Sequence, residues 1–199
     1  NLGINKANYF ISRNLAHKVT IGDNGNILEE LNISYKNASN TRMGGDYKNY
    51  LRIVLPSNTT ITEILINDTP QVLIDAVMDP LIYEAKDFKP PNGLEIEKVS
   101  QDNKTIYGFI VNVPVGDITK IKIKYTLAAN IFGLNNFSYN LKLFKQPGID
   151  NLPYSFSLAY PKSFNIVNAT DGIKREEEKV MYAEKIIEDK DLIINFAKK

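Results

Sequence analysis

The sequence predicts an all-β fold, an antiparallel β-sandwich, and three observations lead to this prediction. Apolar and polar residues alternate with a period of two from about residue 18 to the end of the chain, as in strands that bury one face. Runs with the 3.6-residue period of a helix are nearly absent. Turn-forming residues interrupt the alternation at the spacing found in sandwiches, which gives about a dozen short strands.

The first two strands are expected at residues 17–22 and 27–36, joined by a turn at Asp23–Asn26. Asn and Gly tolerate the positive φ that a hairpin turn requires. The same four residues offer oxygen ligands, but the distal glutamate of a calcium-binding loop is missing. We therefore interpret them as a hairpin turn.

The middle of the chain predicts a second hairpin and a meander. Strands at residues 50–55 and 61–66 flank the turn formers of residues 56–60 and are expected to pair. Residues 71–84 fit either short buried strands or one brief helix broken at Pro80, and we favour strands. After the Pro- and Gly-containing break at residues 89–93, three strands are expected at residues 94–99, 105–113 and 118–127, with an inward row of Tyr107, Phe109, Val111 and Val113.

The last third of the chain shows the clearest alternation. Two strands are expected to bury the rows Phe137, Tyr139, Leu141, Leu143 and Tyr154, Phe156, Leu158, Tyr160. Between them, Pro147 followed by Gly148 matches the chemistry of a type II turn. A closing hairpin is expected to pair residues 179–187 with residues 192–196.

A change in pattern suggests how the chain is divided. The alternation lapses around residues 128–136, which predicts an immunoglobulin-like N-terminal sandwich over residues 1–130 and a smaller C-terminal β unit over residues 131–199. Five strands in about 60 residues are marginally stable alone. The two units are therefore expected to pack together, and one continuous β domain is the alternative.

Composition excludes several classes of function. The net charge of +1 provides no field that would attract nucleic acid or an anionic membrane. The absence of cysteine excludes thiol nucleophiles, disulfides and thiolate metal sites. The longest uncharged run, residues 125–141, contains four asparagines, which are costly in hydrocarbon. We expect no nucleic-acid partner, no cofactor and no membrane-spanning segment.

Candidate catalytic residues are few. His17 is the only histidine and lies in a predicted strand. No Gly-x-Ser-x-Gly elbow supplies a nucleophile for it, and a histidine metal site needs further imidazole or thiolate ligands. The carboxylate pairs Asp75 with Asp79 and Glu95 with Glu97 could in principle hydrolyse glycosides. Their spacing favours solvated surface charges, so no catalytic residue and no metal ligand is assigned.

Tyrosine offers the strongest hint of a ligand. The chain has 11 tyrosines and no tryptophan, and tyrosine rings can stack on sugars. Most tyrosines fall in the inward rows and are expected in the core. Tyr9, Tyr47 and Tyr50 fall outside these rows and are the candidates for glycan contact.

Three segments carry a resemblance to a known family: residues 1–11, residues 47–56 and residues 145–148. In this order and at these separations they resemble the C-terminal region of the bacterial domain-of-unknown-function family four thousand and twelve. The resemblance implies a long bacterial protein with an N-terminal membrane helix and a large region outside the membrane. It implies a location and an architecture, and no catalytic residues.

These observations lead to one functional hypothesis and two alternatives. We expect a non-catalytic structural or interaction module on the outer face of a bacterial membrane, whose partners bind its loops or an exposed edge strand. The chain begins in mid-pattern at Asn1, which suggests a piece of a longer protein. The alternatives are a module that binds envelope polysaccharide and, third, a glycan-processing enzyme. The partner would be polysaccharide or another envelope protein.

Overall fold

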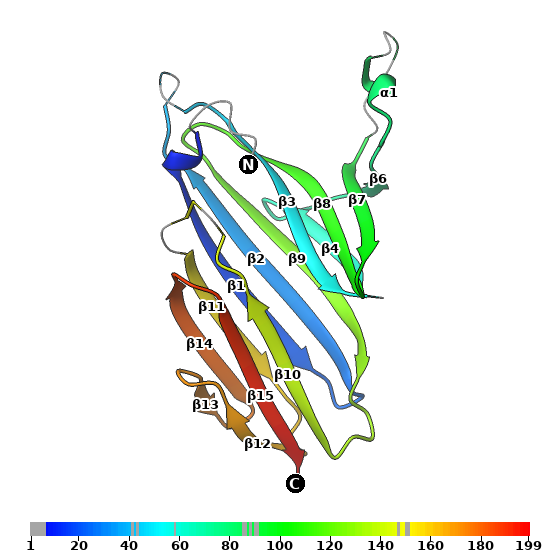
Figure 1. The fold of residues 1–199 in the computed structure, drawn as a ribbon, viewed down its shortest axis with the longest axis vertical. Helices are drawn as coiled ribbons and strands as arrows, with labels where there is room; N and C mark the ends of the chain where they lie inside the picture. The colour runs from blue at the N-terminus through cyan, green and yellow to red at the C-terminus, as the bar shows by residue number, and fades with distance from the viewer. Residues whose placement is uncertain are drawn as a thin grey trace.

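The structure is a computed structural model that describes residues 7–40, 42, 44–57, 59–84, 87, 89, 92–146, 148–149 and 152–199. These residues form fifteen strands in three sheets (Figure 1). The all-β sandwich predicted from the alternation is confirmed. No helix among the described residues has the length and apolar character needed to cross a bilayer.

The largest sheet has eight strands in the order β13-β14-β11-β1-β2-β9-β4-β5. Their bounds, in chain order, are β1 (Ile11–Ile21), β2 (Asn26–Asn37), β4 (Thr60–Ile66), β5 (Thr69–Pro70), β9 (Ile118–Asn130), β11 (Leu152–Ala159), β13 (Lys174–Glu176) and β14 (Lys179–Ile186). The chain enters this sheet after the 3-10 turn η1 (Ala7–Phe10).

Two smaller sheets cover one face of the large sheet, side by side (Figure 1). One has the order β3-β8-β7-β6 and consists of β3 (Tyr47–Pro56), β6 (Leu73–Asp75), β7 (Leu94–Gln101) and β8 (Lys104–Val113). The other has the order β10-β15-β12 and consists of β10 (Asn136–Leu143), β12 (Phe164–Ala169) and β15 (Lys190–Lys198). The single α-helical turn α1 (Pro80–Glu84) lies between β6 and β7.

Each small sheet closes its own hydrophobic core. The first core packs Phe109, Val111 and Val113 of β8 against Ile121 and Ile123 of β9. The second core packs the Phe156 and Leu158 row of β11 against Leu192, Ile194 and Phe196 of β15. The inward rows predicted for residues 107–113 and 154–160 are therefore confirmed, because all eight of their side chains are buried.

The two cores share strands of the large sheet. In β1, Ile11 belongs to the first core and Val19 to the second, and Leu15 between them packs against both. The β1–β11 pair joins the N-terminal part of the chain to its last third within one sheet. The division into units 1–130 and 131–199 stays a prediction, and this continuous sheet crosses its proposed boundary.

Three expected strand pairings are wrong. β3 pairs with β8 and β4 with β9, so residues 50–55 and 61–66 form no hairpin. β8 and β9 lie in different sheets, which leaves only the β7–β8 part of the expected meander. β14 pairs with β11, whereas β15 pairs with β10 and β12, so the closing hairpin is absent. At each of these places the chain crosses from one sheet to another.

Turn geometry gives the physical reason for the missing closing hairpin. Two adjacent residues with positive φ, Asn67 with Asp68 and Asp102 with Asn103, join β4 to β5 and β7 to β8, and such pairs suit tight hairpins. The residues between β14 and β15 all have negative φ. Alternation shows which face of a strand is buried but not which strand lies beside it.

Residues 71–84 contain both a short strand and a short helix, the two structures that the sequence allowed for this segment. Residues 73–75 form β6, as favoured, and α1 follows, beginning at Pro80. Proline fits the first helical position, and the Asp79 carboxylate accepts a hydrogen bond from the Leu81 amide at 2.9 Å, which caps the turn. The expected burial is wrong, because Leu73, Leu81 and Ile82 are exposed.

We predict that substitution by alanine destabilises the fold more at Gly25 than at Gly133. Both have φ near +80°, which costs an L-residue about 1–2 kcal/mol. A Cβ on Gly25 would also lie 2.3 Å from both Asn130 Oδ1 and the Phe132 amide nitrogen, whereas a Cβ on Gly133 meets nothing within 4 Å. Urea denaturation should show a larger loss for Gly25→Ala, by about 1–3 kcal/mol. Equal losses of stability in the two variants would contradict the close packing of the β1–β2 turn against the end of β9.

Candidate functional site

A buried polar cluster lies between the two cores. His17 of β1 and Glu29 of β2 are 5% and 6% exposed, and His17 Nε2 lies 2.8 Å from Glu29 Oε2. Tyr125 of β9 donates a hydrogen bond to Oε2 at 2.7 Å and Tyr139 of β10 donates to Oε1 at 2.9 Å. The Tyr154 hydroxyl of β11 lies 3.3 Å from His17 Nδ1. Tyr125 belongs to the first core and the other two tyrosines to the second.

One hydrogen-bond arrangement satisfies all five groups. A proton on Nε2 of His17 is donated to Glu29, and Nδ1 then accepts the hydroxyl proton of Tyr154. Both carboxylate oxygens of Glu29 accept donors from the protein. The cluster therefore uses its hydrogen-bonding capacity internally, as a buried carboxylate must. It has the geometry of a structural network that joins five strands.

Burial and the carboxylate also act on the tyrosines. Desolvation, followed by the negative charge of Glu29, raises the pKa of Tyr125, Tyr139 and Tyr154 far above its ordinary value. Burial likewise raises the pKa of Tyr35 to about 12. The phenols of the cluster are therefore held in the neutral, hydrogen-bonding form.

The sequence placed His17 in a strand but did not identify its partners. Glu29 shares the inward side of β2 with Ile27, Ile33 and Tyr35. In the sequence, this carboxylate alternates in step with three apolar residues that are buried, and that pattern could have predicted its inward position. The tyrosine partners come from three other strands, and their convergence depends on pairings that alternation does not reveal.

The predicted carboxylate pairs do not face one another as acid and nucleophile would. Asp79 caps α1. Glu95 Oε1 accepts a hydrogen bond from the Val77 amide at 3.2 Å, and Glu97 is hydrogen-bonded to the Tyr50 hydroxyl. Asp75 lines a cavity. Among the described residues, no group of three His, Asp or Glu side chains is placed to hold a metal ion.

The remaining candidates have clear structural roles. Asp23–Asn26 forms the β1–β2 turn, where the Asn24 side chain accepts a hydrogen bond from the Asn26 amide at 3.1 Å. Tyr47 is buried, and its hydroxyl accepts a hydrogen bond from Arg13. Tyr9 and Tyr50 are exposed, and they lie on η1 and β3. Tyr50 covers Gly108, where a Cβ would collide with its ring.

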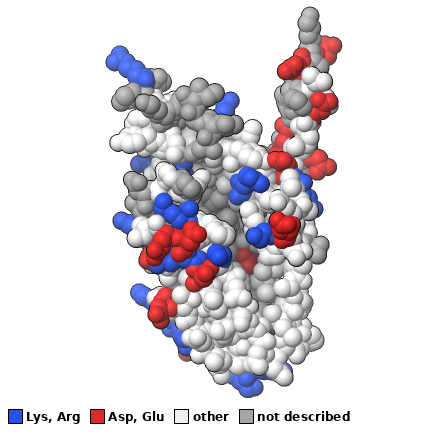
Figure 2. Space-filling view, viewed as in Figure 1, with Lys and Arg blue, Asp and Glu red and all other residues white. Residues whose placement is uncertain are grey.

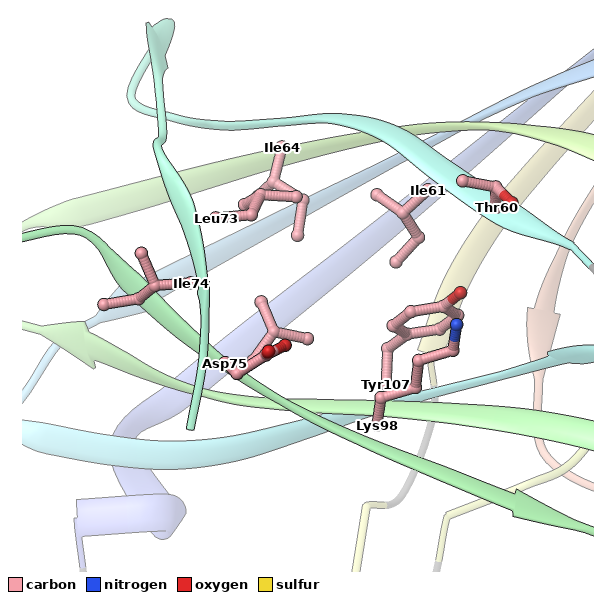
Figure 3. Close-up of a pocket in the computed structure, with 9 residues that line it drawn as sticks. Thr60, Ile61, Ile64, Leu73, Ile74, Asp75, Lys98 and Tyr107 are labelled. Atoms are coloured by element: carbon pink, nitrogen blue, oxygen red, sulfur yellow. The ribbon is translucent and has the colours of Figure 1, made fainter. Parts of the chain in front are cut away.

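A slot between two sheet edges is the most distinctive cavity (Figure 3). Thr60, Ile61 and Ile64 of β4 form one wall, and residues from the sheet of β6, β7 and β8 form the other. The cavity holds about 190 Å³. Its walls are apolar except for the hydroxyls of Thr60 and Tyr107, the Asp75 carboxylate and the Lys98 ammonium group, which lies over the Tyr107 ring at 5.7 Å. Such a slot can enclose one apolar group between two opposite charges.

A segment that projects from the sandwich lies beside this slot. We name residues 71–84 the arm; it carries β6, which pairs with β7, and α1, which stands away from the sheets (Figure 1). Three backbone hydrogen bonds fix its base: Gln71 N to Ile64 O, Leu94 N to Val72 O and Ala76 N to Ile96 O. The arm exposes large apolar side chains, namely Val72 at its base and Met78, Leu81 and Ile82 beyond it.

Comparisons with known proteins identify the fold only. No family model and no curated protein matches the chain. A candidate nutrient-binding protein from Legionella pneumophila is similar at 10% identity with a TM-score of 0.51, over 94% of this chain and 67% of that one. An M1 zinc metallopeptidase from Deinococcus radiodurans (9% identity, TM-score 0.36) and a candidate protease from Parabacteroides distasonis (10%, 0.46) match over 93% and 95% of this chain. The chain spans only 41% and 40% of those two, and what it shares with the Legionella protein is the sandwich fold.

We predict that Tyr139→Phe costs more stability than Tyr107→Phe. The Tyr139 hydroxyl donates to the buried Glu29 carboxylate, whereas the equally buried Tyr107 hydroxyl donates to the Thr59 carbonyl at 2.9 Å. A hydrogen bond to a charged group contributes about 1.5–3 kcal/mol and a neutral one about 1 kcal/mol. Urea denaturation at neutral pH measures both. A loss from Tyr139→Phe no larger than that from Tyr107→Phe would contradict the stronger hydrogen bond assigned to the Tyr139 hydroxyl.

We predict that the fold loses stability as pH rises above about 10. The cluster tyrosines have pKa values raised on folding, so above pH 10 the unfolded chain releases protons that the folded chain retains. Stability is therefore complete below pH 10 and falls above it. Absorbance at 295 nm should show these phenols ionising only together with unfolding, followed by circular dichroism. Their ionisation in a folded chain would contradict the assignment.

Proposed function

We propose that this chain is a non-catalytic interaction module of a bacterial cell-envelope protein and that it holds a protein partner through the arm. The exposed apolar side chains of the arm carry this proposal. Leu81 is 70% exposed and Met78 is 67% exposed, although the base of the arm is fixed by backbone hydrogen bonds. Burying a side chain of this size contributes about 1.5–3 kcal/mol, so a partner that covers the arm gains most of its binding energy there.

The charge of the arm fits the same interpretation. Residues 71–84 contain Asp75, Asp79 and Glu84 and no basic residue. In Figure 2 acidic side chains follow the projection, whereas the lower part of the same face carries little charge. Apolar residues ringed by carboxylates form a surface suited to a partner with an apolar patch and a basic rim.

Two considerations support the rest of the proposal. The His17 and Glu29 side chains, which would be the obvious acid and base, are sealed in a network that satisfies their hydrogen bonds. The envelope location comes from the resemblance described above, as do the bacterial origin and the attachment to a membrane. All three are parts of the proposal.

Envelope polysaccharide is the second candidate partner, and one surface favours it. The outer face of the eight-stranded sheet has two adjoining hollows of about 520 and 300 Å³. They share Ala16 and Asn32, and Asn14, Ser34 and Ser155 add further amides and hydroxyls. Such groups can bind sugar hydroxyls, but Tyr182, the tyrosine among the described residues that line these hollows, is only 6% exposed and offers little of its ring as a platform.

The test compares two double variants that remove matched apolar surface. Leu81→Ser with Ile82→Ser changes the arm, where exposures are 70% and 43%. Val167→Ser with Ile193→Ser changes the β12–β15 sheet, where exposures are 66% and 42%. Immobilised protein is incubated with detergent-solubilised envelope proteins and, separately, with protein-free polysaccharide from the source bacterium. The proposal expects protease-sensitive binding that the arm variant lowers at least about tenfold and the control variant leaves unchanged.

Two results would contradict this function. Equal retention by both variants would remove the arm from the interaction. Binding of the protein-free polysaccharide that both variants preserve, and that periodate oxidation of the sugars abolishes, would replace the proposal with the polysaccharide-binding alternative.

A further inference from the structure

β6 leaves one of its two sides without a strand. It is the last strand in the order β3-β8-β7-β6. The Val72 carbonyl and the Ala76 amide are hydrogen-bonded to β7, and backbone groups of successive residues point to opposite sides of a strand. The N–H and C=O groups of Leu73 and Asp75 therefore point to the open side, where the described residues place no strand.

The inward face of β6 is also uncovered. Leu73 and Asp75 pair with Leu94 and Ile96, which point into the core. Figure 3 shows Leu73 close to Ile64 and the Asp75 carboxylate directed into the slot. Leu73 is nevertheless 38% exposed, and β5, the edge strand of the large sheet next to β4, has only two residues. The sandwich thus lacks one strand where the slot opens.

The dimensions of the slot define what can enter it. Its volume of about 190 Å³ is below the 300–1,000 Å³ that small-molecule sites occupy, so it suits a single side chain. Strands lie about 4.8 Å apart and alternate side chains share a face. A strand added beside β6 would point one side chain toward Ile61 and Ile64, and the residue two positions away on one side would lie near Asp75.

We propose that an extended peptide segment of a partner protein pairs with the open edge of β6 and inserts one large apolar side chain, flanked by basic residues, into the slot. This inference rests on the interaction function proposed above and names the binding mode. Backbone pairing supplies affinity and the slot supplies selectivity, as in other cases of strand addition. One basic residue matches the carboxylate of Asp75, which lines the slot together with Lys98, and the other matches the acidic composition of the arm.

The probe is a fluorescein-labelled peptide with leucine at its centre, lysine two positions to each side and threonine elsewhere. Three altered peptides separate the contributions: serine for leucine, glutamate for both lysines, and N-methyl groups on the amides that would face β6. Fluorescence anisotropy at low salt gives each dissociation constant. Each alteration should weaken binding, the loss of leucine by at least about tenfold.

Protein variants test the same contacts. Thr60→Phe fills the slot from its exposed rim, and Thr62→Phe places the same ring on the same strand, outside the residues that line the slot. The first should weaken the lysine peptide at least about tenfold and the second should leave its affinity unchanged. Asp75→Asn should weaken the lysine peptide about threefold, as expected for an exposed ion pair, and should leave a peptide with threonine in place of both lysines unaffected.

The outcomes separate this inference from the function on which it rests. Equal affinity of wild type, Thr60→Phe and Asp75→Asn for the lysine peptide, or no saturable binding of it, would overturn the strand-addition mode. In the envelope-protein assay, a loss with both the arm variant and Thr60→Phe supports both proposals. A loss with the arm variant alone overturns this inference and leaves the interaction function standing. If neither the arm variant nor Thr60→Phe lowers binding of the envelope proteins, both proposals are overturned.

Discussion

One apolar face of an eight-stranded sheet has to be covered, and neither small sheet is wide enough to cover it alone. The chain solves this with two small sheets placed side by side, each closing a separate core against the same long strands. Crossings between sheets, in place of hairpins, follow from this arrangement. So does the slot, which lies where β4 of the large sheet faces β6, β7 and β8 of a small one.

The place where the two cores meet is polar. Glu29 there accepts hydrogen bonds from two tyrosines and a histidine contributed by β1, β9 and β10. A buried carboxylate is costly unless each lone pair finds a donor, so the network forms only when all these strands are in register. This requirement couples the two halves of the sandwich, since Tyr125 belongs to one core and Tyr139 to the other.

The sequence was sufficient to predict which residues face inward. The row from Tyr107 to Val113 and the row from Tyr154 to Tyr160 are buried as predicted, because a period of two reports burial directly. The sequence was not sufficient to predict which strands pair with one another. β1 pairs in parallel with β11 across more than a hundred residues, and no local pattern encodes such a contact. The slot was beyond reach for the same reason, since Ile61 and Asp75 come from edges of different sheets.

The open edge of β6 is the feature on which the strand-addition account of partner binding depends, and amide hydrogen exchange followed by NMR measures it directly. The Ala76 amide is hydrogen-bonded to Ile96 and should exchange slowly. The amides of Leu73 and Asp75 should exchange as fast as those of an unstructured chain and become protected when a partner strand binds. Slow exchange of Leu73 and Asp75 in the isolated chain would show that the edge is already covered and would contradict the account.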